Sequence, residues 1–256
     1  MKLILNADDF GLTETVNNAI VDCFRSGIVR STTIMMNQPG TQHAVDLYHQ
    51  GLIREVGLHF TVTAGKPILD AKQVSTLVDE QGDFLERREL YRKTDICSEQ
   101  VYKEIQAQYQ AALNAGLAIN HLDTHHFGGI FPRLKAAFTR FANDVNLPVR
   151  RTDSIIAGQD VLKVTTTDAF DVGFYNDGAN LEHLKAMLIS YQHKVPNGIV
   201  EFMCHPAKEV TTELKRLSGY TDKRVAEFNI LTSIELKDWL AANNIECIGF
   251  DMLSSR

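Results

Sequence analysis

The 256-residue chain has the length and composition of one large globular domain. Apolar residues make up 44% of it and charged residues 23%, which is enough apolar side chain for a full core. The formal net charge of −6 leaves no basic stripe to neutralise phosphates, so a protein that wraps nucleic acid is disfavoured. The four cysteines form no CxxC pair, which disfavours a zinc knuckle and a redox dithiol.

The N-terminal sequence MKLILNADDFG has only a short apolar run before its first charges. Such a run is too short for a signal peptide, and no other segment approaches the length of a membrane span. We therefore expect a cytoplasmic protein without a membrane partner.

Short apolar runs alternate with amphipathic segments along nearly the whole chain. In chain order, the first half predicts a strand at Lys2–Asn6, a helix at Thr13–Ser26, a strand at Ser31–Asn37, a helix at Pro39–His49, a strand at Glu55–Thr63, a helix at Ser98–Ala115 and a strand at Ile119–Asp123. The second half predicts a helix at Pro132–Asn146, strands at Pro148–Thr152 and Ala169–Tyr175, a helix at Asn180–His193, a strand at Gly198–Cys204, a helix at Thr232–Asn243 and a strand at Glu246–Phe250.

This alternation predicts an α/β protein with a parallel sheet covered by helices. Seven or eight strand–helix units in a chain of this length favour a (β/α) barrel-like fold, complete or incomplete. An open doubly wound sheet is the alternative, because periodicity cannot show whether a sheet closes.

Residues 63–99 have no clear period and interrupt the alternation. They contain Gly65, Pro67, Gly82 and a run of charges at Glu86–Glu89. We interpret them as an irregular insertion in a single catalytic domain of residues 1–256, serving as a lid or as part of a subunit interface.

Polar residues capable of chemistry recur at the carboxyl ends of the predicted strands. They are Asp8, Asp9, His59, Asp123, His125, His126 and His205. The carboxyl ends of the strands of an α/β barrel converge on one face, where sites are built. The sequence therefore predicts one site that draws on distant segments.

Asp8 and Asp9 are adjacent carboxylates that leave a buried strand. Both can stay ionised only beside a cation or strong hydrogen-bond donors. Neighbouring side chains also point in different directions, so one can bind a metal while the other faces a nucleophile. In the alternative interpretation, Asp9 caps the helix that begins near Thr13, and Asp8 is solvated.

The histidines complete a candidate metal site. His59 lies between apolar residues, where a hydrogen-bonded core histidine is the alternative. The cluster His121–His126 contains three histidines and a carboxylate, which can supply a ligand and the partner that orients it. His121 is alternatively a plain strand residue. Two histidines and one carboxylate leave positions for water on zinc or magnesium.

Two further features suit proton transfer and anion binding. Pro206 holds His205 at a strand end, and a histidine titrates near neutral pH, which suits a general acid. Packing of His205 beside Pro206 is the alternative. Arg150 and Arg151 can bind an anion or orient a carboxylate, unless they are simply a solvated pair.

Several motifs in order resemble one family, the YdjC-like carbohydrate deacetylases, which include the chitooligosaccharide deacetylases. The motifs are Asn6-Ala7-Asp8-Asp9-Phe10-Gly11, Ser31-Thr32-Thr33, Gly57-Leu58-His59-Phe60, Gly65-Lys66-Pro67 and His121-Leu122-Asp123-Thr124-His125-His126. The resemblance implies a barrel-like fold and hydrolysis of the N-acetyl group of an acetylated amino sugar or chitooligosaccharide. It also implies one divalent ion, Mg²⁺ or Zn²⁺, and often a homodimer.

The resemblance also implies roles for individual residues. Asp9, His59 and His125 match the metal ligands. Asp8 matches the general base that takes a proton from the attacking water, and His205 matches the general acid that protonates the leaving amine.

We assign His126 and Arg151 to binding of the sugar. The chain departs from the family where further histidines often follow His126, because it has Phe127 and Gly129 there. That departure affects the expected substrate preference.

Three other functions remain open at this stage. They are a different metal hydrolase on the same barrel, such as a phosphoesterase, a non-catalytic sugar-binding protein, and a metal-free glycosidase with paired carboxylates. A sugar-binding protein needs aromatic platforms, and the single Trp239 lies in a predicted amphipathic helix.

Overall fold

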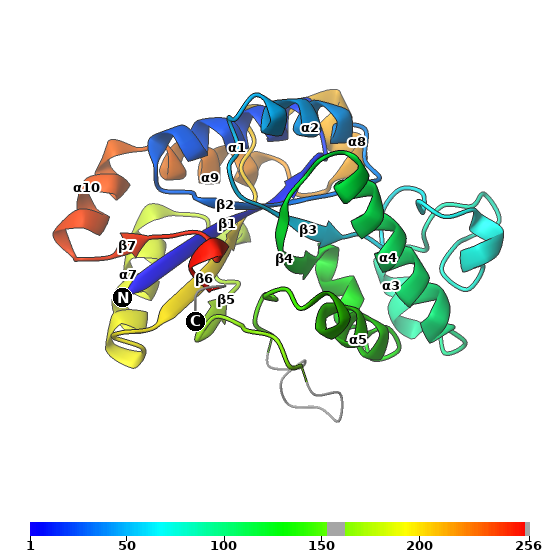
Figure 1. Cartoon of the computed structure of the whole chain (residues 1–256). Coiled ribbons are helices and arrows are strands. Elements are labelled where there is room, and N and C mark those ends of the chain that lie inside the picture. Colours follow the sequence, from blue (N-terminus) through cyan, green and yellow to red (C-terminus); the bar gives the residue numbers. More distant parts are fainter. Residues whose placement is uncertain (153–161, 254–256) are drawn as a thin grey trace.

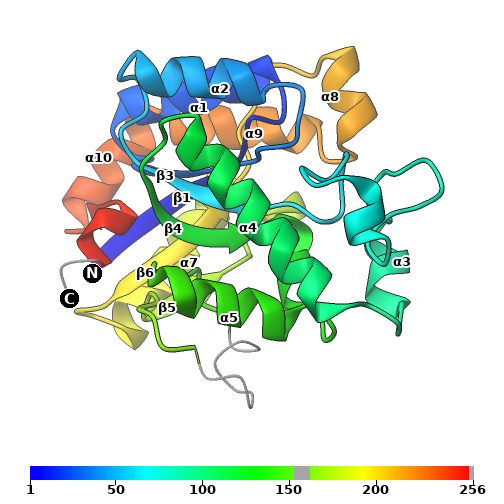
Figure 2. The same cartoon turned by 45° about the vertical axis from the view of Figure 1, so that its right-hand side comes forward.

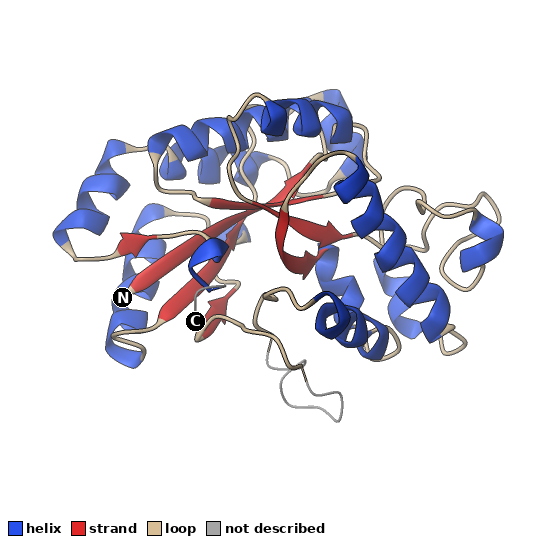
Figure 3. Ribbon diagram, in the orientation of Figure 1, coloured by secondary structure: helices blue, strands red, loops and turns tan. Residues whose placement is uncertain are grey.

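The computed structural model describes residues 1–152 and 162–253, and its centre is a parallel sheet (Figures 1 and 3). Within these ranges the sheet has seven strands, ordered β4-β3-β2-β1-β6-β5, with β7 paired to β1. The strands are β1 (Lys2–Phe10), β2 (Ser31–Ile34), β3 (Val56–Phe60), β4 (Ile119–Thr124), β5 (Ala169–Asp171), β6 (Ile199–Cys204) and β7 (Glu246–Cys247).

Helices surround the sheet in both views of the molecule (Figures 1 and 2). They are α1 (Glu14–Ser26), α2 (Thr41–His49), α3 (Arg87–Arg92), α4 (Ser98–Asn114), α5 (Lys135–Val145), α7 (Leu181–Lys194), α8 (Thr212–Leu217), α9 (Asp222–Leu231) and α10 (Ile234–Ala242). Short 3₁₀ turns lie at Ala71–Val74, His125–Ile130, Asn176–Gly178 and Phe250–Leu253. None of the helices in the described ranges is both long and apolar enough to cross a membrane.

The sheet curls into a half-barrel, so the prediction of an incomplete barrel-like α/β fold is confirmed. In the described ranges, β4 and β5 are the ends of the strand order. The predicted strand Pro148–Thr152 is wrong as a strand, since only Val149 makes a bridge, to Leu122 of β4. That segment therefore adds one residue pair to the edge of β4 instead of another full strand.

Helix α1 shows how the sequence sets an element. Thr13 caps it, because its Oγ1 accepts a hydrogen bond from the backbone N–H of Val16 at 3.3 Å. Gly27 ends it in the left-handed conformation, with φ of 81°. The alternative role of Asp9 as the cap of this helix is therefore wrong.

Strand β1 lies at the centre of the sheet and is longer than predicted. It continues to Phe10 instead of stopping at Asn6, and it pairs with β2, β6 and β7. The pairing with β2 shifts register between Ala7 and Phe10, which marks an irregularity at the two aspartates. Asp8 and Asp9 thus belong to the last residues of β1, at the carboxyl edge of the sheet.

The alternation of β1 explains which side chains reach the interior. Leu3 and Leu5 belong to the main core, whereas Ile4 packs in a smaller cluster with Phe250. Asn6 and Asp8 lie on the same face as Ile4 by the period of two. The register shift turns the side chain of Asp9 towards this face as well, although a strict alternation would place Asp9 on the opposite face.

The irregular insertion at residues 63–99 forms a lobe beside the barrel (cyan in Figure 1). Its regular parts are a 3₁₀ turn, helix α3 and an isolated antiparallel bridge between Val78 and Phe84. The buried Glu104 of α4 anchors it by accepting hydrogen bonds from the backbone N–H groups of Ile68 (2.8 Å) and Leu69 (3.1 Å). Its role as a lid or an interface stays a prediction, as does the single-domain organisation.

Candidate active site

A cavity of about 250 Å³ opens where the strands end. Its lining includes Asp8, Asp9, His59, His125, His126 and His205, all named from the sequence. Further lining residues are Arg87, Thr124, Phe127, Arg150, Val172, Tyr175, Met203, Ser218, Tyr220 and Arg224. Six predicted site residues from four segments thus meet in one place.

Asp9, His59 and His125 point three ligand atoms at one another. Oδ1 of Asp9 lies 3.3 Å from Nε2 of His59 and 3.0 Å from Nδ1 of His125, and the two ring nitrogens are 3.2 Å apart. All three residues are buried, and Oδ1 of Asp9 has no hydrogen-bond partner within the described ranges. One carboxylate oxygen and two imidazole nitrogens around an unsatisfied atom fit a divalent ion such as Zn²⁺ or Mg²⁺.

Asp8, His59 and Asp123 also lie close enough to hold an ion. Here, however, Arg150 occupies the carboxylates. Its guanidinium donates to Asp8 at 2.6 and 2.8 Å, and it lies 2.9 Å from Oδ2 of Asp123. Arg150 engages both oxygens of Asp8, whereas Oδ1 of Asp9 has no hydrogen-bond partner among the described residues, so the group of Asp9, His59 and His125 is the better candidate for a metal.

Asp123 contacts the ring nitrogen of His59 that faces away from Asp9. Nδ1 of His59 lies 2.6 Å from Oδ1 of Asp123, which leaves Nε2 facing Asp9. Thr33 donates to Oδ2 of Asp123 at 3.1 Å and fixes that carboxylate in turn. A carboxylate behind a ligating histidine sets its tautomer and its direction.

Asp9, His59 and His125 are called the metal group below. Asp8 and His205 face each other beside it, with Nε2 of His205 3.8 Å from Oδ2 of Asp8. Burial alone would raise the pKa of Asp8, but Arg150 outweighs it and holds the pKa well below its usual range. Burial lowers the pKa of His205 to about 4, so its imidazole is neutral at pH 7. The pair thus consists of an anion and a neutral base.

Aromatic and acidic side chains also contact His205. The rings of Tyr175 and Tyr220 lie edge-on to its imidazole, at 5.5 and 5.7 Å between centroids. Its backbone N–H and the Tyr220 hydroxyl both donate to the carboxylate of the buried Glu227. Burial raises the pKa of Glu227 to about 8.

Comparison with known proteins identifies the family. A profile described as YdjC-like protein matches residues 2–242. The chain belongs to this family. The resemblance predicted from the sequence motifs is therefore confirmed.

Curated relatives match this chain over nearly their whole length and share one name. "Carbohydrate deacetylase" of Thermoanaerobacter pseudethanolicus is 37% identical over 253 residues, which is 98% of each chain. "Carbohydrate deacetylase" of Vibrio cholerae is 37% identical over 257 residues, which is 100% of this chain and 97% of the relative. The family and its enzyme class, predicted from the motifs, agree with these relatives.

One solved structure supports the fold over nearly the whole chain. The crystal structure of a "putative cellobiose-phosphate cleavage protein" from Enterococcus faecalis is 31% identical, with a TM-score of 0.89 and 98% of each chain covered. A structure described as T48 deacetylase with substrate is only 11% identical, with a TM-score of 0.51, and shares the fold alone.

The buried arginines at the site of this YdjC-like protein are Arg150 and Arg224, whereas the sequence-based assignment to sugar binding was Arg151. Arg150 is buried at the site, whereas Arg151 is not in the cavity lining. Arg224 was not identified from the sequence at all, yet it lies on Asp9, with Nη2 2.6 Å from Oδ2. No local motif marks Arg224, because it sits on helix α9, which the apolar pattern did not predict.

The segment after His125 carries Phe127 and Gly129, where the chain departs from the family pattern. His126 and Phe127 both have left-handed backbone angles, with φ of 54° and 57°, and both line the cavity. Side chains of β3, β4 and α5 leave no space for a histidine at Gly129, where an added Cβ would lie 2.9 Å from Oγ1 of Thr124 and 3.1 Å from the rings of Phe60 and Phe138. Nδ1 of His126 is 3.1 Å from Oγ1 of Thr63, so His126 also ties the loop to the insertion.

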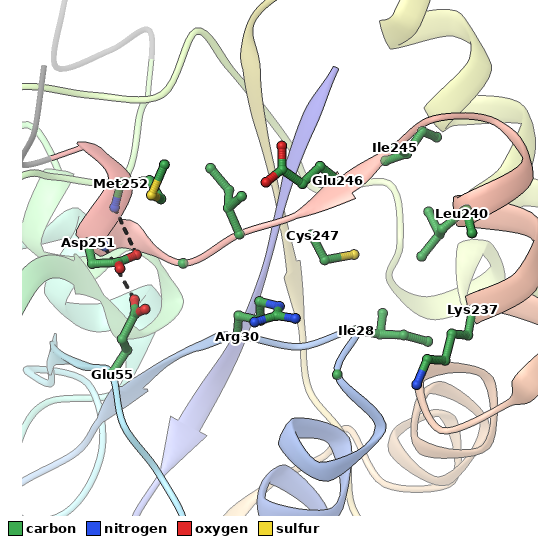
Figure 4. A pocket seen from close by; sticks show the side chains of 14 residues that line it. Ile28, Arg30, Glu55, Lys237, Leu240, Ile245, Glu246, Cys247, Asp251 and Met252 are labelled. Atoms are coloured by element: carbon green, nitrogen blue, oxygen red, sulfur yellow. Dashed lines mark hydrogen bonds between the residues drawn. The ribbon is translucent and has the colours of Figure 1, made fainter.

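A second hollow of about 420 Å³ lies at the other end of the barrel (Figure 4). Its lining includes Arg30 and Glu55, which directly precede β2 and β3, Lys237 of α10, and Asp251, which follows β7. It contains none of the residues of the metal group, so it is separate from the candidate active site.

Proposed function

We propose that this chain removes the N-acetyl group from an acetylated amino sugar or chitooligosaccharide by metal-dependent hydrolysis, with release of acetate. The observation that carries the proposal is the unsatisfied Oδ1 of Asp9 between two imidazole nitrogens, beside Asp8 and His205. The deacetylase names of the curated relatives support it.

Asp9, His59 and His125 are the residues that would hold one Mg²⁺ or Zn²⁺. When bound, such an ion polarises the acetyl carbonyl and makes a water molecule more acidic. The remaining residues of the cavity then orient the sugar and move protons.

Asp8 takes a proton from the water that attacks the acetyl carbon. Its two oxygens are fixed by Arg150, so the carboxylate cannot turn away from the cavity. The pKa of His205, about 4, lies above that of Asp8, so the proton is more stable on His205. His205 passes it to the sugar nitrogen as the C–N bond breaks, which yields acetate and a free amine.

The rim of the cavity indicates a sugar that carries a negative group. Arg87 lines the cavity and also a neighbouring hollow of about 530 Å³, whose lining is completed by Arg88, Tyr91, Arg92 and Phe131. The three arginines are exposed, and Tyr91 is 58% exposed with its ring edge-on to Phe131. An aromatic platform between guanidinium groups suits a second sugar ring that bears a phosphate.

We therefore propose a phosphorylated, N-acetylated oligosaccharide as the preferred substrate. The description of the E. faecalis structure, which mentions cellobiose-phosphate, agrees with this preference. His126 is in the lining and remains a proposed sugar contact, whereas the proposed contact at Arg151 has no support from the lining.

A phosphoesterase is the second candidate on this scaffold. Such sites usually hold two metal ions close together. The only described position for a neighbouring ion, among Asp8, His59 and Asp123, has the guanidinium of Arg150 bound to both carboxylates. A single ion and amide hydrolysis are therefore favoured.

The deciding experiment measures acetate and phosphate released from N-acetylated mono- and oligosaccharides, each with and without a phosphate group. We expect acetate alone, loss of activity after exhaustive chelation, and recovery with one divalent ion per chain. Phosphate release with two ions per chain would favour a phosphoesterase, and full activity after chelation would refute metal dependence. Light scattering of the same preparation checks the predicted homodimer.

A further inference from the structure

Helix α9 brings a buried arginine onto the carboxylate that faces the metal position. Nη2 of Arg224 lies 2.6 Å from Oδ2 of Asp9, and the two side chains are 3% and 1% exposed. Nε of Arg224 donates to the backbone oxygen of Tyr220 at 2.8 Å. The guanidinium is therefore held at two points and cannot follow Asp9 if that carboxylate turns.

The two oxygens of Asp9 have different surroundings. Oδ2 accepts the hydrogen bond from Arg224, whereas Oδ1 faces His59 and His125 without any hydrogen bond from the described residues. The backbone of Asp9 is left-handed, with φ of 68°, a conformation that costs free energy for a residue other than glycine. The fold thus maintains a costly conformation that presents one oxygen and ties down the other.

We propose that Arg224 is a positioning residue that makes Asp9 a one-oxygen ligand of the catalytic ion. The proposal rests on the metal site described above. A carboxylate can bind a divalent ion through one oxygen or two. By occupying Oδ2, Arg224 would leave only Oδ1 of Asp9 available to an ion.

The charge of Arg224 distinguishes this role from simple support of metal binding. A guanidinium next to the ligand repels a cation, so it does not serve to increase affinity. Its loss removes that repulsion and frees the second oxygen of Asp9. We therefore expect metal binding to persist without Arg224 while catalysis suffers.

The test compares Arg224→Met with the wild type and with Arg216→Met, a matched change at an exposed arginine of the neighbouring helix α8. Metal-free protein is titrated with Zn²⁺ to obtain the Kd and with Co²⁺ to obtain a visible spectrum. For Arg224→Met we expect a Kd no weaker than that of the wild type, weaker Co²⁺ bands from an added ligand atom, and a kcat about 10- to 100-fold lower with little change in KM. Arg216→Met should match the wild type in all three.

Arg224→Lys is the second variant, since lysine retains the positive charge and can still donate a hydrogen bond to Asp9. We expect its Co²⁺ spectrum and kcat to lie between those of the wild type and Arg224→Met, and it decides the question if the methionine variant does not fold. An unchanged Co²⁺ spectrum in a metal-loaded variant, or a Kd weakened more than tenfold in a folded one, would overturn the proposal. If the wild type binds one ion but releases no acetate, the proposed activity fails while the spectral result still tests Arg224.

Discussion

Asp8 and Asp9 are neighbours in one strand, yet their carboxylates have separate partners. Arg150 holds both oxygens of Asp8, whereas Arg224 holds one oxygen of Asp9. The register shift of β1 at this point and the left-handed φ of Asp9 turn two successive side chains into one cavity. Two acids that would repel each other in an ordinary strand end can therefore be ionised together.

Replacement of Asp8 by asparagine tests the proposed base. The Asp8→Asn side chain keeps its size but cannot take a proton, so we expect kcat to fall by a factor of about 10² to 10⁴. Metal content should stay at one ion per chain, because Asp9, His59 and His125 are untouched. Acetate release and metal analysis check the two parts, with Asp238→Asn on the exposed face of α10 as the control. A fully active Asp8→Asn enzyme would refute the assignment.

At the scale of elements, helix α9 contributes Arg224, a site residue that the sequence did not predict. Its buried residues are Arg224, Glu227 and Leu231, so the inward face has the spacing of a helix but carries charges. A search for apolar periodicity therefore finds no helix there. The histidines at the strand ends were predictable because both their residue type and their position are visible in the sequence.

Arg150 and Arg151 show a second limit of the sequence. Adjacent residues in an extended segment point to opposite sides, and a shift of one residue exchanges them. The bridge between Val149 and Leu122 sets the register of this segment against β4, and that pairing depends on the folded sheet. The sequence could thus predict an arginine at the site without showing which of the two it is.

The insertion helix α3 carries the proposed recognition of phosphate. We expect Arg87→Gln combined with Arg88→Gln to raise KM for a phosphorylated acetylated sugar about tenfold or more. Each lost charge-assisted hydrogen bond is worth roughly 1.5–3 kcal/mol. The unphosphorylated sugar should be affected little, because the metal group lies deeper. Steady-state kinetics on the matched pair of sugars checks this, with Arg54→Gln, an exposed arginine on the loop before β3, as the control. Equal losses for both sugars would contradict a phosphate subsite.

For the whole molecule, the active site is a concentration of buried charge in the middle of the fold. Asp8, Asp9 and Asp123 are buried, and Arg150 and Arg224 are the arginines that contact them in the described part of the chain. The buried Glu201 also contacts Arg150, at 2.6 Å, and burial raises its pKa to about 7. Burial alone would lower the pKa of His59, but Asp123 and the two neighbouring aspartates raise it to about 10. In the metal-free site a proton on His59 therefore offsets part of the negative charge, and a divalent cation would replace that proton.

Binding of the ion should therefore stabilise the folded chain as a whole. At a free metal concentration of about 100 times Kd, the gain is about 2.7 kcal/mol, which corresponds to a rise in Tm of roughly 5–10 °C for a chain of this length. The variant His125→Gln removes one ligand at the cavity while leaving Asp9 paired with Arg224, so most of the rise should be lost. Thermal unfolding of chelated and metal-loaded protein measures the effect, and the exposed His183→Gln provides the control for metal bound at surface histidines. An equal rise in His125→Gln would place the stabilising ion elsewhere and would argue against the ligand group of Asp9, His59 and His125.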